Sequence, residues 1–206
     1  MPIAHHSIDV RVRMPFVYPA TLSLTGRRNL IVDIGPGRGD FLFHLAREYP
    51  DQLAVGIEIK SKRADKLIQR IELQQLTNAV VIQDDARQAL PRFFAEGQVA
   101  TIHINFPDPW PKRSHSKNRL IQPEFVAECI RVLQPGGALF FTTDVEWYAA
   151  AVAKEIASVG AIRKSPLQSC YPEGITTSSP DAFPTYFSQK WQREGRTIFY
   201  QKYRRR

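Results

Sequence analysis

The stretch NLIVDIGPGRGDF, residues 29–41, indicates how this chain folds. It opens with a short apolar run, which predicts a buried strand, and that run ends in Gly-Pro-Gly. The residues that follow, DFLFHLAREY (40–49), place apolar side chains at helical spacing. A strand, a glycine-rich turn and a helix in this order predict the first unit of an α/β sheet.

The same alternation continues along the chain, so we predict right-handed crossovers onto a parallel sheet with helices on both faces. RTIFYQKY (196–203) predicts a late antiparallel strand, at an edge or between other strands. The further predicted strands are LAVGIEI (53–59), AVVIQ (79–83), VATIHI (99–104) and GALFFTT (137–143). The further predicted helices are SKRADKLIQRIELQQL (61–76) with Ser61 as N-cap, QPEFVAECIRVL (122–133), which starts near Pro123 and is stopped by Pro135-Gly136-Gly137, and EWYAAAVAKEIASVG (146–160), closed by Gly160. ARQALPRFFAEG (86–97) predicts a helix or a pair of turns.

The composition indicates one globular domain over residues 1–206, with residues 1–28 as an irregular basic arm that contains Arg11, Arg13, Arg27 and Arg28. Lys and Arg outnumber Asp and Glu by 28 to 20, which favours a polyanionic partner, above all nucleic acid, over a merely basic protein. Cys129 and Cys170 lie far apart, which indicates a reducing compartment without disulfides. We find no apolar run of about 18 residues and no signal peptide, and expect a cytoplasmic protein without a membrane partner.

The glycine loop predicts the class of cofactor. Gly35, Gly37 and Gly39 let the backbone turn tightly and approach a ligand closely. Their spacing is Gly-x-Gly-x-Gly and not the Gly-x-Gly-x-x-Gly of pyrophosphate binders. A nicotinamide oxidoreductase is therefore disfavoured, and S-adenosylmethionine, a nucleotide without pyrophosphate, fits better.

Acidic residues stand at the ends of the predicted strands. Glu58 ends the second strand, where a carboxylate can accept hydrogen bonds from both ribose hydroxyls. Asp84 and Asp85 end the third, where one of them could accept from an adenine amino group. Asp33, near the end of the first strand, is a further candidate for contact with the cofactor. The alternative for Asp33 is that its carboxylate braces the glycine loop, and the alternative for Glu58 is that it is a solvated strand end.

The stretch NFPDPWPKR (105–113) is a stiff corner after the fourth strand. Its prolines can hold Asp108 in place at low entropic cost, and Trp110 could stack on a base or close the pocket. A basic loop follows, which we expect to bind phosphate unless it is a solvated surface: Lys112, Arg113, His115, Lys117 and Arg119.

Together, DIGPGRG, GIEI, DDA, NFPDPWPK, TTD and TYFSQKWQREG resemble the bacterial tRNA guanine-N7 methyltransferase family. The resemblance covers about residues 30–200, and FPDPW followed by Lys is its most specific part. It implies a Rossmann-like class I methyltransferase fold with a seven-stranded sheet, S-adenosylmethionine as donor and guanine 46 of the tRNA variable loop as acceptor.

The resemblance also implies roles for particular residues. Asp33, Glu58, Asp85 and Asp108 fall on the family's cofactor-contacting acids, with Gly35 and Gly37 in the cofactor loop, and Asp108 also falls on its proposed catalytic position. Lys112, Asp144, Thr185, Tyr186, Phe187 and Ser188 fall on its substrate-contacting positions. The chain departs from the family at Ser188, where a Glu is usual.

Guanine N7 carries an in-plane lone pair and needs no proton removed, so we expect an ionised Asp108 to supply positioning or negative charge, without a metal. With Ser188 in place of the family Glu, Asp144 is the nearest candidate to accept from guanine's ring N–H and amine; the alternative is that Asp144 caps the helix beginning near Glu146. The alternative functions are an amino-group methyltransferase and a non-catalytic RNA-binding module. The resemblance implies tRNA as the partner, and the protein is expected to be a monomer or homodimer.

Overall fold

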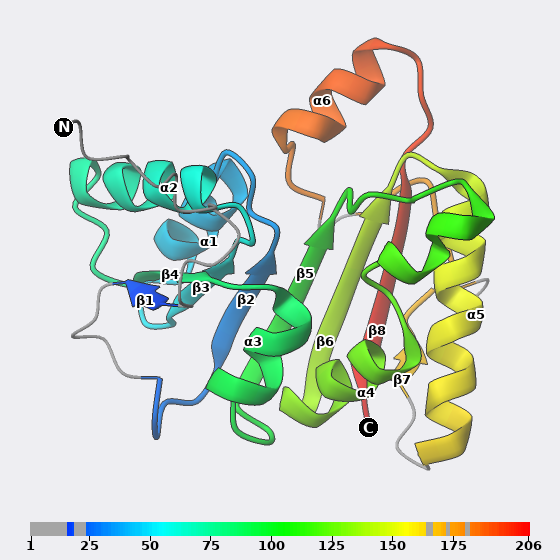
Figure 1. Cartoon of the computed structure of the whole chain (residues 1–206), viewed down its shortest axis with the longest axis horizontal. Helices are drawn as coiled ribbons and strands as arrows, with labels where there is room; N and C mark the ends of the chain where they lie inside the picture. The colour runs from blue at the N-terminus through cyan, green and yellow to red at the C-terminus, as the bar shows by residue number, and fades with distance from the viewer. Residues whose placement is uncertain (1–15, 19–23, 164–166, 172–173, 180–181) are drawn as a thin grey trace, which may run out of the picture.

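The computed structural model describes residues 16–18, 24–163, 167–171, 174–179 and 182–206. Figure 1 shows one sheet, with helices on its two faces and a short helix beyond one end. The strands are β1 (Phe16–Tyr18), β2 (Leu30–Ile34), β3 (Ala54–Ile57), β4 (Ala79–Gln83), β5 (Val99–Asn105), β6 (Leu133–Thr143), β7 (Leu167–Ser169) and β8 (Phe199–Arg205). The helices are α1 (Asp40–Glu48), α2 (Ser61–Leu73), α3 (Ala86–Phe93), the 3-10 helix η2 (Arg113–Asn118), α4 (Pro123–Val132), α5 (Glu146–Arg163) and α6 (Tyr186–Arg193).

The sheet has the order β1-β4-β3-β2-β5-β6-β8-β7. Strands β2 to β6 run parallel, and β8 enters antiparallel between β6 and β7. Strands β2 to β8 thus form the predicted seven-stranded, mostly parallel Rossmann-like sheet. The order reverses between β2 and β5, and a switch point of this kind creates a crevice at the carboxyl ends of the strands.

The strands bury apolar side chains on both faces because helices cover both. On one face, α1 and α2 pack over β2, β3 and β4, where Ile31, Ala54 and Val81 lie in the core. On the other, α3, α4 and α5 pack on the strands, with Tyr148 of α5 against Phe141 of β6. The near-continuous apolar runs read from the sequence follow from this double coverage.

The predicted basic arm, residues 1–28, lies mostly outside the described residues, including Arg11 and Arg13. Part of it is not irregular: β1 pairs antiparallel with β4 and adds an eighth strand at that edge. The Tyr18 hydroxyl donates to Glu72 of α2 at 2.6 Å, which ties the strand to the body. Pairing of this kind covers an edge strand whose backbone groups would otherwise be exposed.

Several sequence-based boundaries are wrong; helix α3, for instance, ends at Phe93 and not at Gly97. Ser61 is the first residue of α2 and not its N-cap, which is Lys60, held extended while its N–H donates to Glu58. Helix α5 does not close at Gly160 but continues to Arg163. Glycine inside a helix costs only about 1 kcal/mol relative to alanine, which the buried face of Val152 and Ile156 outweighs. β6 begins at Leu133, before the Pro-Gly-Gly segment, and its register against β5 shifts there.

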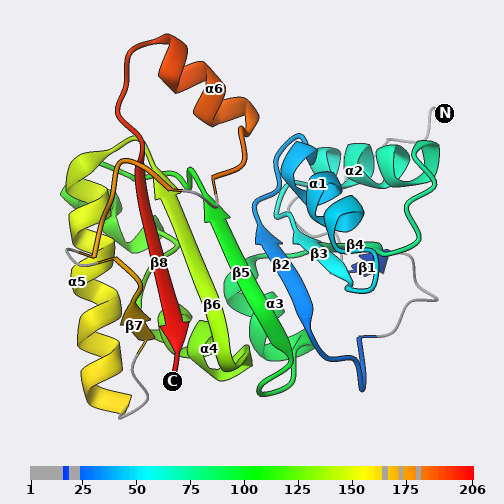
Figure 2. The ribbon, with the colours of Figure 1, turned by 180° about the vertical axis from the view of Figure 1, so that it is seen from behind.

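The carboxyl ends of β2 to β6 all meet at one edge of the sheet, called here the carboxyl edge (Figure 1). Helix α6 stands beyond this edge in both views, joined to the sheet by the segments before and after it (Figure 2). The sequence analysis predicted neither α6 nor β7. The candidate site residues from the sequence analysis follow the ends of these strands or lie at the start of α6.

Candidate functional site

The glycine loop leaves an open backbone surface beside β2. Gly35 and Gly37 adopt left-handed φ angles of 72° and 57°, and a side chain on Gly35 would meet open space. Gly39 is different, because a Cβ there would collide with Leu67 and Phe43. The first two glycines therefore supply the turn and leave room for a ligand, while the third lets α1 pack against α2.

Asp33 and Glu58 are buried carboxyl groups on neighbouring strands. Each side chain is only 2% exposed, and β2 pairs in register with β3 at Asp33 and Gly56. Glu58 accepts the Lys60 N–H through Oε1 at 2.8 Å, while its Oε2 and the Asp33 Oδ2 are buried without any hydrogen-bond partner among the described residues. Unpaired buried carboxylate oxygens are costly, so these two point to a ligand that donates hydrogen bonds to them.

The electrostatics of this pair follow from burial. Burial, and after it the negative charge of Glu58, raises the pKa of Asp33 to about 8. Burial also raises the pKa of Glu58, although the Lys60 N–H and the charges of Arg63 and Lys60 act in the opposite direction. Buried carboxyl groups with shifted pKa values at the ends of neighbouring strands are candidates for a functional site. A cationic donor would return Asp33 to its charged form.

Asp84 and Asp85, at the end of β4, both have partners. Asp85 is the N-cap of α3, accepts the Arg87 N–H at 2.9 Å and forms an ion pair with the Arg87 guanidinium at 2.5 Å. Burial alone would raise the pKa of Asp85, but the hydrogen bonds and charge of Arg87 outweigh it and hold the pKa below its ordinary value. Asp84 accepts the Asp85 N–H and pairs with Arg92. The adenine contact assigned to Asp85 stays a prediction, in addition to its observed capping role.

The corner after β5 is held in a strained shape. Phe106 and Trp110 have left-handed φ angles of 52° and 44°, which non-glycine residues rarely adopt. The Phe106 N–H donates to the Thr142 carbonyl at 2.8 Å, which anchors the start of the corner to β6. Asp108 lies between them, exposed, and within the described part of the chain its carboxylate forms no hydrogen bond or ion pair. The stiff corner therefore presents a free negative charge at the carboxyl edge.

The basic loop divides into two kinds of residue. Lys112, Arg113 and Lys117 are exposed, and their side chains form no hydrogen bond or ion pair with the described residues. Arg119 turns inward and donates to the carbonyls of Pro109 and Trp110, at 3.0 and 3.1 Å. The first group can reach phosphates, whereas Arg119 already holds the corner.

Asp144 does not cap α5. The first turn of that helix uses the carbonyl of Val145, which accepts the N–H groups of Tyr148 and Ala149. The Asp144 carboxylate instead pairs with Arg196 at 2.7 Å. The capping alternative is therefore not supported, and the arginine that follows α6 occupies one oxygen of the predicted guanine acceptor.

Ser188 takes part in the hydrogen bonds that begin helix α6. Thr185 is the N-cap and its hydroxyl accepts the Ser188 N–H at 3.1 Å, while the Ser188 hydroxyl donates to the Thr185 carbonyl at 3.0 Å. Ser188 is only 4% exposed. Tyr186 and Phe187 are 45% and 40% exposed, and the Arg38 guanidinium from the glycine loop lies 4.6 Å from the Tyr186 ring centroid. The hydroxyls close the helix end, whereas the rings face outward.

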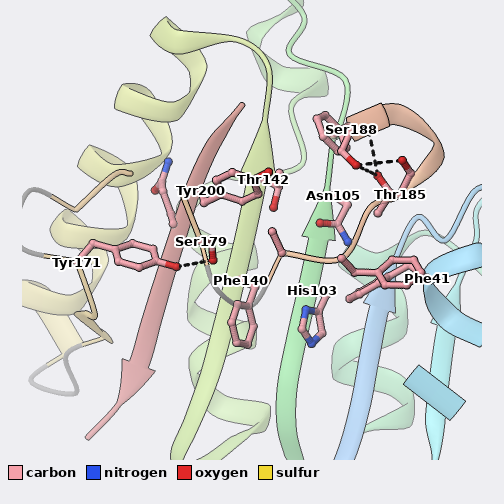
Figure 3. Close-up of a pocket in the computed structure, with 14 residues that line it drawn as sticks. Phe41, His103, Asn105, Phe140, Thr142, Tyr171, Ser179, Thr185, Ser188 and Tyr200 are labelled. Atoms are coloured by element: carbon pink, nitrogen blue, oxygen red, sulfur yellow. Dashed lines mark hydrogen bonds between the residues drawn. The ribbon is translucent and has the colours of Figure 1, made fainter. Parts of the chain in front are cut away.

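A pocket lies between the sheet and the segment that leads into α6 (Figure 3). Its empty space is about 450 Å³, including the part open to solvent. His103, Asn105 and Thr142 form part of its floor, and Thr185 and Ser188 lie at its upper rim. The Asn105 Nδ2 is buried there without a hydrogen-bond partner among the described residues. A pocket lined by both aromatic and polar side chains thus adjoins the corner that carries Asp108.

Comparison with known proteins agrees with this geometry. A family model described as a putative methyltransferase matches residues 27–201. A tRNA (guanine-N(7)-)-methyltransferase of Anaeromyxobacter dehalogenans is 35% identical over 170 residues, which cover 82% of this chain and 82% of the relative. The chain belongs to the bacterial tRNA (guanine-N(7)-)-methyltransferase family.

Other members of the tRNA (guanine-N(7)-)-methyltransferase family match over a shorter span. The one from Syntrophotalea carbinolica is 42% identical over 132 residues, 64% of this chain and 57% of the relative. The chain thus spans little more than half the length of several curated relatives that it matches. Among solved structures, 16S rRNA methyltransferase KamB has a TM-score of 0.63 at 15% identity, covering 87% of this chain and 88% of KamB, which supports the fold alone.

The sequence analysis did not predict two residues that contact the site. These are Arg38, whose guanidinium lies over the Tyr186 ring, and Arg196, which forms an ion pair with Asp144. A basic residue inside the glycine loop is the only signal that could have indicated the first. Among the described residues, no group of three or more His, Cys, Asp or Glu side chains could hold a metal ion. Nor does any described helix have the length and hydropathy that crossing a bilayer requires.

Proposed function

We propose that this protein transfers a methyl group from S-adenosylmethionine to N7 of guanine in tRNA, at variable-loop position 46. The observation that carries the proposal is the pair of buried carboxyl groups, Asp33 and Glu58, each with an oxygen that has no partner, beside an open glycine loop. The family membership supports the same reaction and substrate.

The residues present fit this cofactor, which supplies a sulfonium methyl group when bound. Glu58 would accept hydrogen bonds from the ribose hydroxyls through its free oxygen, and Asp33 would face the cationic amino group. Gly35 and Gly37 would let the backbone approach closely, since they carry no side chain and adopt left-handed angles. Asp85 would contribute at the adenine end from its place at the start of α3.

Asp108 would act on the acceptor base and also lie against the cofactor. Guanine N7 attacks through a lone pair in the ring plane, so no base has to remove a proton. Methylation leaves the purine positively charged, and a fixed carboxylate stabilises charge that develops in the transition state. Asp108 is suited to this because the corner restrains it and no described residue neutralises it.

The RNA would lie across the carboxyl edge and α6. The exposed Lys112, Arg113 and Lys117 can neutralise phosphates, and the half-exposed Tyr186 and Phe187 offer rings to an unpaired base. Thr185 and Ser188 would line the base pocket from the start of α6, and Asp144 would accept from the guanine edge. A cytoplasmic location and a monomeric or homodimeric state stay predictions.

The test is to incubate the protein with methyl-labelled S-adenosylmethionine and an unmodified tRNA transcript, digest the RNA and identify the labelled nucleoside. The expected product is 7-methylguanosine, absent from a matched transcript with adenine at position 46. An Asp108→Asn protein is the matched enzyme control, with kcat lower by about 10²-fold or more at little change in tRNA affinity. Label on an exocyclic amine would establish an amino-group methyltransferase, and binding without label a non-catalytic module.

A further inference from the structure

The loop that follows Asp108 is closed on itself by one side chain. The Arg119 Nε donates to the Pro109 carbonyl at 3.0 Å, and its Nη2 donates to the Trp110 carbonyl at 3.1 Å. These carbonyls belong to the two residues directly after Asp108. The planar fork of a guanidinium can bridge neighbouring carbonyls in this way, which a lysine ammonium cannot reproduce.

The corner needs support of this kind. Phe106 and Trp110 both have positive φ angles, at 52° and 44°, and lie on either side of Asp108. A non-glycine residue in this region costs on the order of 1–3 kcal/mol and persists only where the surroundings fix it. The first strained residue is held by the bond from its N–H to Thr142. The second is held through its carbonyl by Arg119.

Arg119 is itself fixed from the other side. Its guanidinium lies 5.0 Å from the ring centroid of Trp147, in the first turn of α5. Its backbone N–H donates to Ser116 at 3.1 Å, at the end of η2. The side chain thus spans from the start of α5 to the Asp108 corner, so that a regular helix of the fold positions a loop.

Within the basic loop, this use of Arg119 differs from that of its neighbours. Lys112, Arg113 and Lys117 are exposed, and in the described structure their side chains have no hydrogen-bond or ion-pair partner. Arg119 is half-buried, with two of its donors directed at the protein backbone. Charge alone would group all four as phosphate ligands, but the contacts separate Arg119 from the rest.

We infer that Arg119, seated on Trp147, is a positioning residue that holds the Asp108 corner in its strained, reactive shape and is not a ligand of the RNA. The kinetic part of this inference rests on the proposed methyl transfer. The structural part does not, because the shape of the corner can be measured without turnover.

The kinetic test compares Arg119→Ala and Arg119→Lys with Arg113→Ala. Arg119→Ala should slow single-turnover methylation by about 10²-fold, the scale of a small misplacement of a catalytic group. Its tRNA affinity, and the slope of log K against log salt, should match the parent. Arg119→Lys should recover little of the rate, because it keeps the charge but not the fork. Arg113→Ala should instead lower the slope by roughly 0.7–0.9, as expected for the loss of one phosphate contact.

The structural test is amide hydrogen exchange over residues 105–111, with the crystal structure of Arg119→Ala. Faster exchange within the corner, above all at Phe106, whose N–H donates to the Thr142 carbonyl, is expected, with a melting temperature close to that of the parent. The matched control is Arg47→Ala, which removes an exposed arginine in the last turn of α1 and should leave the exchange of residues 105–111 unchanged. Should Arg119→Ala fail to fold, Trp147→Leu removes the aromatic seat alone, at an exposed position, and should loosen the same amides to a smaller extent.

A normal methylation rate together with an unchanged corner would overturn the inference. So would a reduced salt slope in Arg119→Ala, since that would make Arg119 a phosphate ligand. If the parent protein methylates no tRNA, the proposed function fails, and the exchange experiment still decides whether Arg119 holds the corner.

Discussion

Replacing Asp33 with asparagine should stabilise the ligand-free protein near neutral pH while weakening its hold on S-adenosylmethionine. Asn has nearly the shape of Asp but cannot ionise. In the parent, burial raises the pKa of Asp33 from 3.8 to about 8. The folded protein therefore retains a proton that the unfolded chain releases over this whole interval.

The sign follows from that difference in bound protons. Below about pH 4 the carboxyl group is protonated in both states and the stability it contributes is fully present. As the pH rises towards 8, that contribution is lost at about 1.4 kcal/mol per pH unit, because the folded state binds the extra proton. Between pH 5 and pH 7 the free energy of unfolding should thus fall by about 3 kcal/mol more in the parent than in Asp33→Asn. The high net charge is common to both proteins and cancels in the comparison, whereas the repulsion between Asp33 and Glu58 belongs to the parent alone and is part of the measured difference.

The assay is urea denaturation of both proteins at half-unit steps from pH 5 to pH 8, without cofactor, followed by calorimetry with S-adenosylmethionine. The denaturation curves should diverge as the pH rises, with the variant the more stable. Parent affinity for the cofactor should increase from pH 5 to pH 7, because binding to the cationic amino group releases the proton of Asp33 while that amino group is still charged. The variant should bind about tenfold or more weakly, with little dependence on pH.

Parallel stability curves for the two proteins would refute the reasoning about burial, since Asp33 would then titrate alike in the folded and unfolded states. If the stabilities diverge but the two proteins bind the cofactor equally well, Asp33 is a buried, protonated acid that does not contact the cofactor. Asp40→Asn, a partly exposed acid in the next helix that pairs with Arg70, is the matched control and should alter neither measurement by much.

Three further perturbations test the rest of the site. Glu58→Ala should weaken S-adenosylmethionine binding by about 30-fold or more, since it loses two charge-assisted hydrogen bonds to the ribose; unchanged affinity by calorimetry would exclude that contact. Replacing Lys112, Arg113 and Lys117 together with alanine should weaken tRNA binding and lower the salt slope by roughly 0.7–0.9 per true phosphate contact; a parental slope would show a solvated surface. Asp144→Asn should lower kcat/KM by about 2–4 kcal/mol with little change in melting temperature, because the Asn oxygen can still accept from Arg196, whose side chain is partly exposed; an active, guanine-specific variant would remove Asp144 from the site.

Most of the sheet could be predicted because its signals are local. Each strand that the helices cover on both faces is a short apolar run, and each run is followed by a turn or an acid. The errors lie where local preference is weak. Gly160 is a good helix stop in isolation, but α5 continues because its preceding turns are buried. β1 and β7 are three residues long, too short for a periodic pattern.

The sequence by itself determined the parallel α/β architecture, the glycine loop and the acids at the strand ends, because periodicity and strand direction bring those ends to one edge. Only the tertiary structure decided what each polar side chain does there. Asp144 meets Arg196 across 52 residues, Asp85 turns to cap its own helix, and Arg119 braces the corner while its basic neighbours face solvent. The physical reason is that composition sets the charge of a loop, whereas the dihedral angles of the corner and the packing of distant helices set the direction in which each side chain points.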